Sequence, residues 1–250
     1  MIAKFKRKYR NNAIFRRAWT LFKHLYYSEK LLVNEHQKLM SFLKEYKVNF
    51  VLDVGANVGQ FAVDIRDAGY TGELLSFEPE PIAFNTLSLK SSKDKKWHVY
   101  NLALSNSNCL ANFHVSSDDA LSSSLNFPTQ LQLNTYPKSA TSKDILVNCV
   151  TLDGYIGKFH DDRESKVIAL KLDVQGHELK VLEGAKEVLQ EISLVYCEVS
   201  FSYLYESQPS FFELLDFLDK VGFELVDIRN LKYSSKRLVQ SDLILVKKSI

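Results

Sequence analysis

A continuous apolar run that ends in a glycine loop is the feature that most constrains how this chain folds. Residues 49–54 read Asn-Phe-Val-Leu-Asp-Val, and Gly55 follows directly. A strand with apolar side chains on both faces is typical of a parallel sheet that helices cover on both sides. The run therefore predicts an interior strand of an α/β fold.

Similar runs alternate with helical patterns over the rest of the chain. Four further buried strands are predicted, at residues 73–77, 97–102, 167–172 and 192–199. Helices are predicted at residues 35–46, 57–68 and 210–222, the last opened by the capping box Ser210-x-x-Glu213. Strands that alternate with helices predict a mainly parallel, doubly wound Rossmann-like sheet, whose ligand crevice lies at the carboxyl ends of the strands.

Two further segments depart from this alternation. Residues 223–228 and 242–246 are strand-like and predict a terminal antiparallel hairpin, with a polar stretch between them. Residues 116–144 contain seven serines and two prolines and are longer than an ordinary connection. The strand-like residues around them, 109–115 and 145–151, could pair with each other. The serine-rich stretch is then either a solvated surface loop or a mobile flap over the site.

The positive charge of the chain is concentrated at its amino end. Residues 1–28 hold eight Lys and Arg and no acid, which leaves 24 basic residues against 30 acidic ones in the rest. Residues 11–27 predict a helix with an apolar stripe. That helix either lies on an anionic membrane surface or packs its stripe on the domain. We therefore divide the chain into a basic helical extension at residues 1–47 and one domain at residues 48–250.

Length and composition also limit the location of the protein. No run of 18 apolar residues occurs, and no apolar segment follows the basic start as it would in a signal peptide. The three cysteines have no framework spacing. These features indicate the cytoplasm, with peripheral contact at the inner membrane surface if the basic helix binds lipid. The acidic body disfavours nucleic acid as a partner.

The loop after the first strand is a candidate cofactor site. It carries Gly55, Asn57 and Gly59 and leads straight into a helix, whose free N–H groups can bind an anion. Glu78 ends the second strand, 23 residues after Gly55, where an acid can bind both hydroxyls of a ribose. A turn whose glycines serve packing alone is the alternative for the loop.

Charge indicates which nucleotide cofactor suits this loop. A dinucleotide site needs G-x-G-x-x-G, and Asn57 and Gln60 stand where its second and third glycines would fall. Asp53 would repel a phosphate, and no P-loop motif occurs. S-adenosylmethionine (SAM) carries an ammonium and a sulfonium beside one carboxylate, so an acid at Asp53 and helix N–H groups match it. SAM is therefore favoured over NAD.

At this point the sequence resembles the FkbM-type family of SAM-dependent methyltransferases. The matching stretches are LDVGANVGQF (52–61), FEPEP (77–81), NLALS (101–105), VTLDGYI (150–156) and LKLDVQGHELKVLEGA (170–185). The resemblance implies a class I methyltransferase fold and O-methylation of a hydroxyl on a sugar, glycan or natural product. It does not name the acceptor. Ala103, within NLALS, joins Asp53, Gly55, Asn57, Gly59 and Glu78 in the expected cofactor site.

The carboxyl ends of the fourth and fifth strands carry the candidate catalytic residues. Asp173 and Glu198 stand there, and His177 follows Asp173 closely. Methyl transfer to a hydroxyl needs a group that aligns the oxygen and accepts its proton, which these side chains can do. His177 could instead begin a helix and point to solvent, and Lys171 is expected to form an ion pair. A metal site drawn from Asp173, His177 and Glu178 is a weak alternative, because no zinc-type spacing supports it, and no metal is assigned. A catalytically silent SAM-binding module is the main alternative.

Overall fold

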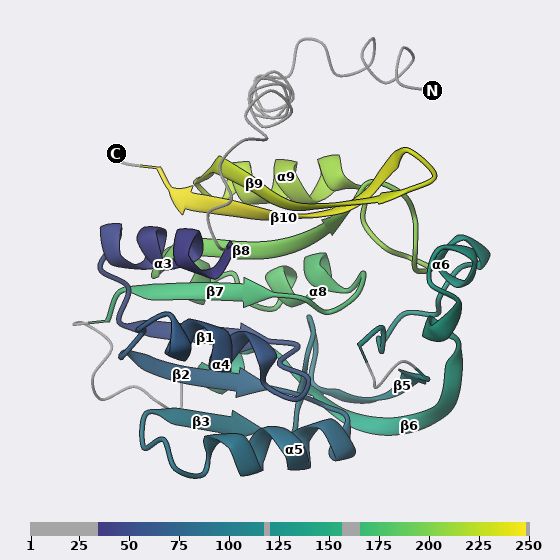
Figure 1. Ribbon diagram of the computed structural model, residues 1–250, viewed down its shortest axis with the longest axis horizontal. Coiled ribbons are helices and arrows are strands. Elements are labelled where there is room, and N and C mark those ends of the chain that lie inside the picture. Colours follow the sequence, from purple (N-terminus) through teal and green to yellow (C-terminus); the bar gives the residue numbers. More distant parts are fainter. Residues whose placement is uncertain (1–34, 118–120, 157–165, 249–250) are drawn as a thin grey trace, which may run out of the picture.

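A seven-stranded sheet forms the centre of the molecule (Figure 1). The computed structural model describes residues 35–117, 121–156 and 166–248. The strand order is β3-β2-β1-β7-β8-β10-β9. These strands are β1 (Phe50–Val54), β2 (Glu73–Phe77), β3 (Trp97–Tyr100), β7 (Ile168–Leu172), β8 (Ile192–Ser200), β9 (Phe223–Ser234) and β10 (Arg237–Lys247).

Five of these strands are parallel, and β10 pairs antiparallel with both β8 and β9. The predicted doubly wound sheet with a terminal hairpin is confirmed. Every residue of β1 and of β7 is buried, as their apolar runs predict.

The hairpin is longer than predicted. Most of the polar stretch at residues 229–241 is strand, because β9 continues to Ser234 and β10 begins at Arg237. Ser235 and Lys236 make the turn, both with positive φ. The stretch lacks an apolar pattern because side chains such as those of Lys232 and Gln240 form polar contacts there instead of packing into the core.

Helices cover both faces of the sheet. α3 (Glu35–Glu45), α4 (Gln60–Asp67) and α5 (Pro81–Ser91) contribute to one hydrophobic cluster. α7 (Leu152–Ile156), α8 (Glu178–Glu183) and α9 (Phe211–Lys220) contribute to the other. The helix predicted at residues 57–68 begins only at Gln60, because Asn57 and Gly59 adopt positive φ in the turn before it. The capping box of α9 is present as predicted.

A smaller sheet lies beyond the carboxyl ends of the parallel strands (Figure 1). It consists of β4 (Ala103–Leu104), β5 (Cys109–Ser116) and β6 (Thr141–Val150), and we call residues 103–150 the arm. β5 and β6 pair antiparallel, as predicted. Between them, α6 (Gln130–Thr135) follows Thr129, whose N–H donates to the carbonyl of Leu204 at 2.8 Å. The serine-rich stretch thus carries a helix and is bonded to the loop after β8.

Two expectations concern the amino-terminal extension: a helix at residues 11–27, and a segment separate from the domain up to residue 47. The predicted helix at residues 11–27 lies outside the described residues, so its role on a membrane surface stays a prediction. α3 packs Leu39, Met40 and Leu43 into the core beside α4, so the part of the extension from residue 35 onward is built onto the domain. Among the described residues, no helix is both long and apolar enough to cross a membrane.

Candidate active site

A cavity of about 370 Å³ lies at the carboxyl ends of the central strands, where the fold predicts a ligand crevice. The turns after β1 and β2 form one wall, and residues of β7, β8 and β10 form another. Leu121, Ser123 and Leu125 of the arm line it as well. The serine-rich stretch is therefore partly a wall of the site.

Gly55 lets the turn after β1 pass close to β7. Its φ is +76°, and a Cβ atom there would lie 1.9 Å from the carbonyl oxygen of Asp173. No side chain fits such a space, and positive φ is disfavoured for residues other than glycine. The predicted glycine loop thus brings the backbone of β1 against the end of β7, on the floor of the cavity.

Glu78 lines the cavity at the end of β2 and is 5% exposed. Its two carboxylate oxygens each accept one backbone N–H at 2.8 Å, from Asn57 and from Glu80. Burial raises the pKa of Glu78 to about 7, although these two hydrogen bonds oppose the shift. A carboxylate has about four acceptor positions, so Glu78 retains capacity for two hydroxyl donors.

Two of the predicted cofactor residues do not line the cavity. Asp53 is fully buried, where its Oδ2 accepts from Ser76 and its Oδ1 lies 3.1 Å from the Nζ of Lys171. The same Nζ also donates to the carbonyl of Gly55 at 2.7 Å, so Lys171 joins Asp53 to the turn after β1. Asp53 therefore acts on the cavity through Lys171, which lines it.

Gly59 serves packing. A Cβ there would lie 2.8 Å from the side chain of Leu87 and 3.1 Å from that of Trp97. The other predicted cofactor residues, Gly55, Asn57, Glu78 and Ala103, all line the cavity. The alternative of a glycine used for packing alone thus describes Gly59, while Gly55 shapes the cavity itself.

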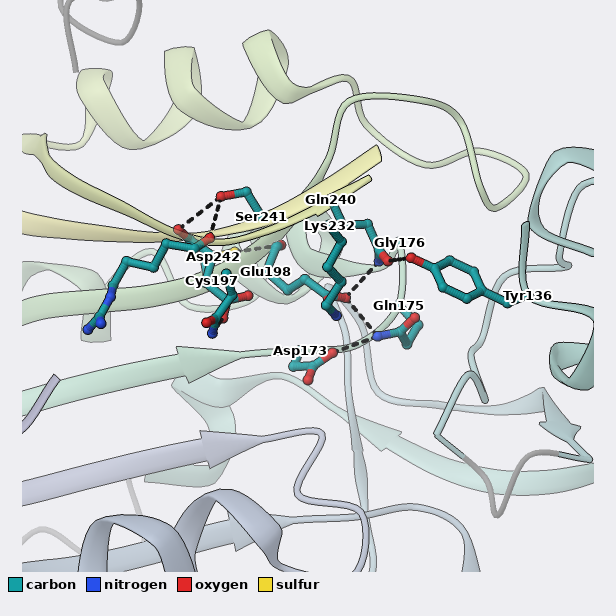
Figure 2. A network of polar contacts seen from close by, with 12 residues as sticks. Tyr136, Asp173, Gln175, Gly176, Cys197, Glu198, Lys232, Gln240, Ser241 and Asp242 are labelled. Carbon is teal, nitrogen blue, oxygen red and sulfur yellow. Dashed lines mark hydrogen bonds and ion pairs between the residues drawn. The ribbon is translucent and has the colours of Figure 1, made fainter. Parts of the chain in front are cut away.

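On the opposite wall, Asp173 and Glu198 are brought together by one side chain (Figure 2). The Nε2 of Gln175 donates to Oδ1 of Asp173 at 2.7 Å and to Oε2 of Glu198 at 2.8 Å. All three residues line the cavity. The two predicted acids are therefore neighbours, and the bridging glutamine is a site residue that the sequence reasoning missed.

Glu198 also contacts the terminal hairpin. Its Oε1 accepts from Lys232 of β9 at 2.7 Å, and its Oε2 accepts from Gln240 of β10 at 3.0 Å. Burial raises the pKa of Glu198 to about 8, the charge of Asp173 adds to the shift, and Lys232 opposes it. Glu198 is therefore a stronger base than a solvated carboxylate.

Asp242, opposite Glu198 in the strand register, is a third acid of the cavity. Its Oδ2 accepts from the Tyr196 hydroxyl and from the side-chain amide of Asn230. Burial raises the pKa of Asp242. The sequence reasoning missed it, although the polar Ser241-Asp242 pair before an apolar strand run is a pattern that could have indicated it.

His177 lies just before α8 and lines the cavity, so the alternative that it points to solvent is wrong. Its Nδ1 lies 2.9 Å from Oδ1 of Asn126, and its Nε2 lies 2.9 Å from the Ser105 hydroxyl. Because Oδ1 of Asn126 can only accept, Nδ1 carries the proton, and Nε2 accepts from the Ser105 hydroxyl in the neutral tautomer. Burial lowers the pKa of His177 to about 4. With both nitrogens bonded, His177 is less suited than Glu198 to accept a proton.

The sequence of this chain matches a known protein family. The model of the methyltransferase FkbM domain matches residues 53–225. The 2-O-methyltransferase NoeI of Sinorhizobium fredii is 29% identical over 197 residues, which are 76% of this chain and 78% of NoeI. The hexuronic acid methyltransferase AglP of Haloferax volcanii is 25% identical over 170 residues, 67% of this chain and 63% of AglP.

Solved structures with a similar arrangement include two methyltransferases. An rRNA methylase from Streptococcus thermophilus is 12% identical, with 88% of this chain and 99% of that one covered and a TM-score of 0.49. Magnesium protoporphyrin IX methyltransferase from Synechocystis, solved with bound SAM, is also 12% identical, with 98% and 96% covered and a TM-score of 0.45.

Proposed function

This chain belongs to the FkbM family of SAM-dependent methyltransferases, and from that premise we propose that it methylates a hydroxyl group of a sugar or glycan. The observation that carries the proposal is the pair of carboxylates, Asp173 and Glu198, on one wall of the cavity. A hydroxyl acceptor must lose a proton during transfer, and a buried carboxylate can take it. The names of NoeI and AglP, a 2-O-methyltransferase and a hexuronic acid methyltransferase, support a sugar acceptor.

The residues of the opposite wall fit SAM. The cavity volume lies within the range of small-molecule sites, and Gly55 keeps its floor free of a side chain. Glu78 can accept from both ribose hydroxyls, and the acids that line the cavity suit a ligand with two cationic groups. SAM supplies an activated methyl group and its own leaving group.

The chain's own side chains then have two tasks, to align the acceptor oxygen and to receive its proton. Glu198 suits the second task, since its raised pKa is closer to the pKa of the acceptor hydroxyl that donates the proton. Asp173 suits the first, because its Oδ1 is fixed by Gln175. The walls of the cavity supply the orientation that an in-line displacement requires.

The proposal predicts a split between turnover and cofactor affinity. Asp173→Asn and Glu198→Gln should each lower turnover by roughly 100- to 10,000-fold while the SAM dissociation constant changes by less than about 5-fold. The control is Asp216→Asn, which removes a half-exposed acid on α9 that pairs with Lys220, outside the cavity. Wild-type turnover in both cavity variants would contradict the assignment.

A panel of acceptors tests the substrate class. We expect mass spectrometry to show a gain of one methyl group on a glycoside or oligosaccharide incubated with the protein and SAM. Methylation of hydroxylated natural products alone would replace the sugar proposal. Binding of SAM by calorimetry without methylation of any acceptor in extracts would favour a catalytically silent module.

A further inference from the structure

We propose that Gln175 is a positioning residue that holds the Asp173 and Glu198 carboxylates together and favours the charged form of Glu198. It follows β7 in a tight turn and lines the cavity, and both N–H groups of its side chain are directed at these two acids (Figure 2). The inference rests on the proposed roles of the two acids, but it does not depend on which acceptor they serve.

The orientation of the amide is set by its partners on both sides. The Tyr205 hydroxyl lies 2.9 Å from Oε1 of Gln175 and 3.1 Å from the Ser122 carbonyl, and its one proton serves these two acceptors. Tyr205 is almost fully buried, with 1% of its surface exposed. A flipped amide would place Oε1 against two carboxylate oxygens, which repel it. Only the observed orientation satisfies Gln175 and both acids at once.

The backbone at Gln175 is held in an unusual conformation. Its φ is +54°, which is uncommon for residues other than glycine and disfavoured unless the surroundings hold it. The Ser124 hydroxyl of the arm donates to the Gln175 carbonyl at 2.8 Å, and Asn126 donates to the Gly176 carbonyl at 3.0 Å. The arm thus stabilises the turn that directs this side chain at the acids.

Besides the Gln175 amide, several charged groups act on the ionisation of Glu198. The charged groups around Glu198 are Asp173 after β7, Lys232 on β9 and Asp242 on β10. Glu178 of α8 is a further buried acid near Asp173. Donors to a carboxylate favour its charged form, so the amide of Gln175 lowers the pH at which Glu198 ionises. Without Gln175, Glu198 should ionise at a higher pH.

The test compares SAM with S-adenosylhomocysteine, the same molecule without the methyl group and the sulfonium charge. Because both contain the ribose that we assign to Glu78, titration of Glu78 cancels in the ratio of their affinities. The ratio of the two affinities therefore depends on the charge of those acids that interact with the sulfonium of SAM. We expect the preference of the wild-type protein for SAM to rise with pH, with a midpoint near 8, as Glu198 ionises.

The variant is Gln175→Leu, and the matched control is Gln132→Leu. Gln132 is a buried glutamine whose Nε2 donates to the same Tyr205 hydroxyl at 3.1 Å, and it does not line the cavity. Calorimetry from pH 6 to 9 should show the midpoint about 1 pH unit higher in Gln175→Leu and unchanged in Gln132→Leu. Gln175→Glu, which nearly keeps the shape but adds a charge, should shift it further in the same direction.

Three results would overturn the inference. They are a pH-independent affinity ratio in the wild-type protein, an unchanged midpoint in both Gln175 variants, and equal shifts in Gln175→Leu and Gln132→Leu. A merely structural role would lower the melting temperature of Gln175→Leu and leave the midpoint in place. Because the readout is binding, failure to methylate any sugar would count against the proposed function alone.

Discussion

The two walls of the cavity are built in different ways. On the wall proposed for the cofactor, backbone groups make the contacts, as where the N–H of Asn57 donates to the Glu78 carboxylate. On the wall proposed for the acceptor, side chains make the contacts, and several of them come from distant parts of the sequence. Lys232 meets Glu198 over 34 residues, and the Tyr136 hydroxyl donates to Gln240 over 104 residues.

The two walls depend on different properties of their residues. A wall made from backbone groups needs a particular chain path, and Gly55 is the residue that permits it. A wall made from side chains needs particular donors and acceptors at distant positions. The cofactor wall should therefore be most sensitive to added atoms that crowd the backbone. The acceptor wall should be most sensitive to changes in charge and hydrogen bonding.

The largest effect should come from Gly55→Ala. The added methyl group would meet the Asp173 carbonyl, which is backbone and has little freedom to move, and positive φ adds strain. We expect a loss of about 4 kcal/mol or more in the free energy of unfolding, measured by urea denaturation. Gly69→Ala is the control, since φ is +97° there with nothing within 4 Å, and it should cost about 1 to 2 kcal/mol. Equal losses of unfolding free energy in Gly55→Ala and Gly69→Ala would contradict the special role of backbone contact at Gly55.

The second effect concerns Lys171, which lies between the two walls. Burial alone would lower the pKa of Lys171, but the charges of Asp53 and Asp173 outweigh it and raise the pKa. Lys171→Met should lower the free energy of unfolding by about 3 kcal/mol, because it leaves the buried Asp53 without its cation. Lys166→Met is the comparison, since Lys166 pairs with the partly exposed Glu73 and should cost far less. A loss at Lys171 no larger than the loss at Lys166 would contradict this prediction.

The third effect tests the ribose assignment. Glu78→Ala should weaken SAM binding by about 1.5 to 3 kcal/mol, or roughly 10- to 150-fold, through the loss of charge-assisted hydrogen bonds. Glu73→Ala, at the other end of β2, should leave the affinity unchanged. An unchanged dissociation constant in Glu78→Ala, measured by calorimetry, would remove Glu78 from the cofactor wall.

The smallest effect is a pH dependence of stability at Glu178. Burial raises the pKa of this acid to about 7, although backbone N–H groups such as those of Val174 and Gly176 oppose the shift. The folded state thus holds a proton that the unfolded state loses near pH 4.5, so the stabilisation is complete below 4.5 and is lost as pH rises to 7. Glu178→Gln should flatten this decline by about 1 to 2 kcal/mol in urea titrations at pH 4.5 and 7. Parallel profiles for variant and wild type would contradict it.

The parallel sheet was predictable because its evidence is local. An apolar run such as Phe50–Val54 must be buried on both faces, and the glycine after it marks the turn. The capping box at Ser210 and Glu213 located the start of α9. The long hairpin was not predictable, because Lys232 and Gln240 bind Glu198 instead of following an apolar alternation.

The candidate site shows the same division. Gly55, Glu78, Asp173 and Glu198 stand at strand ends, which the order of strands and turns identifies. Gln175 and Asp242 acquire their places only when β7, β8 and β10 are assembled. The fully covered position of Asp53 also depends on assembly, because Lys171 reaches it from the neighbouring strand.

The attachment of the arm has a consequence for how substrate range can diverge among related proteins. Ser124 and Asn126 fasten the arm through the backbone carbonyls of Gln175 and Gly176, and Asn126 also contacts the side chain of His177. Leu121, Ser123 and Leu125 line the cavity from that same segment. Mutation can change Leu121, which is 55% exposed, while the anchor and the sheet persist. The arm is thus a place where new acceptor preferences can evolve at little cost to folding.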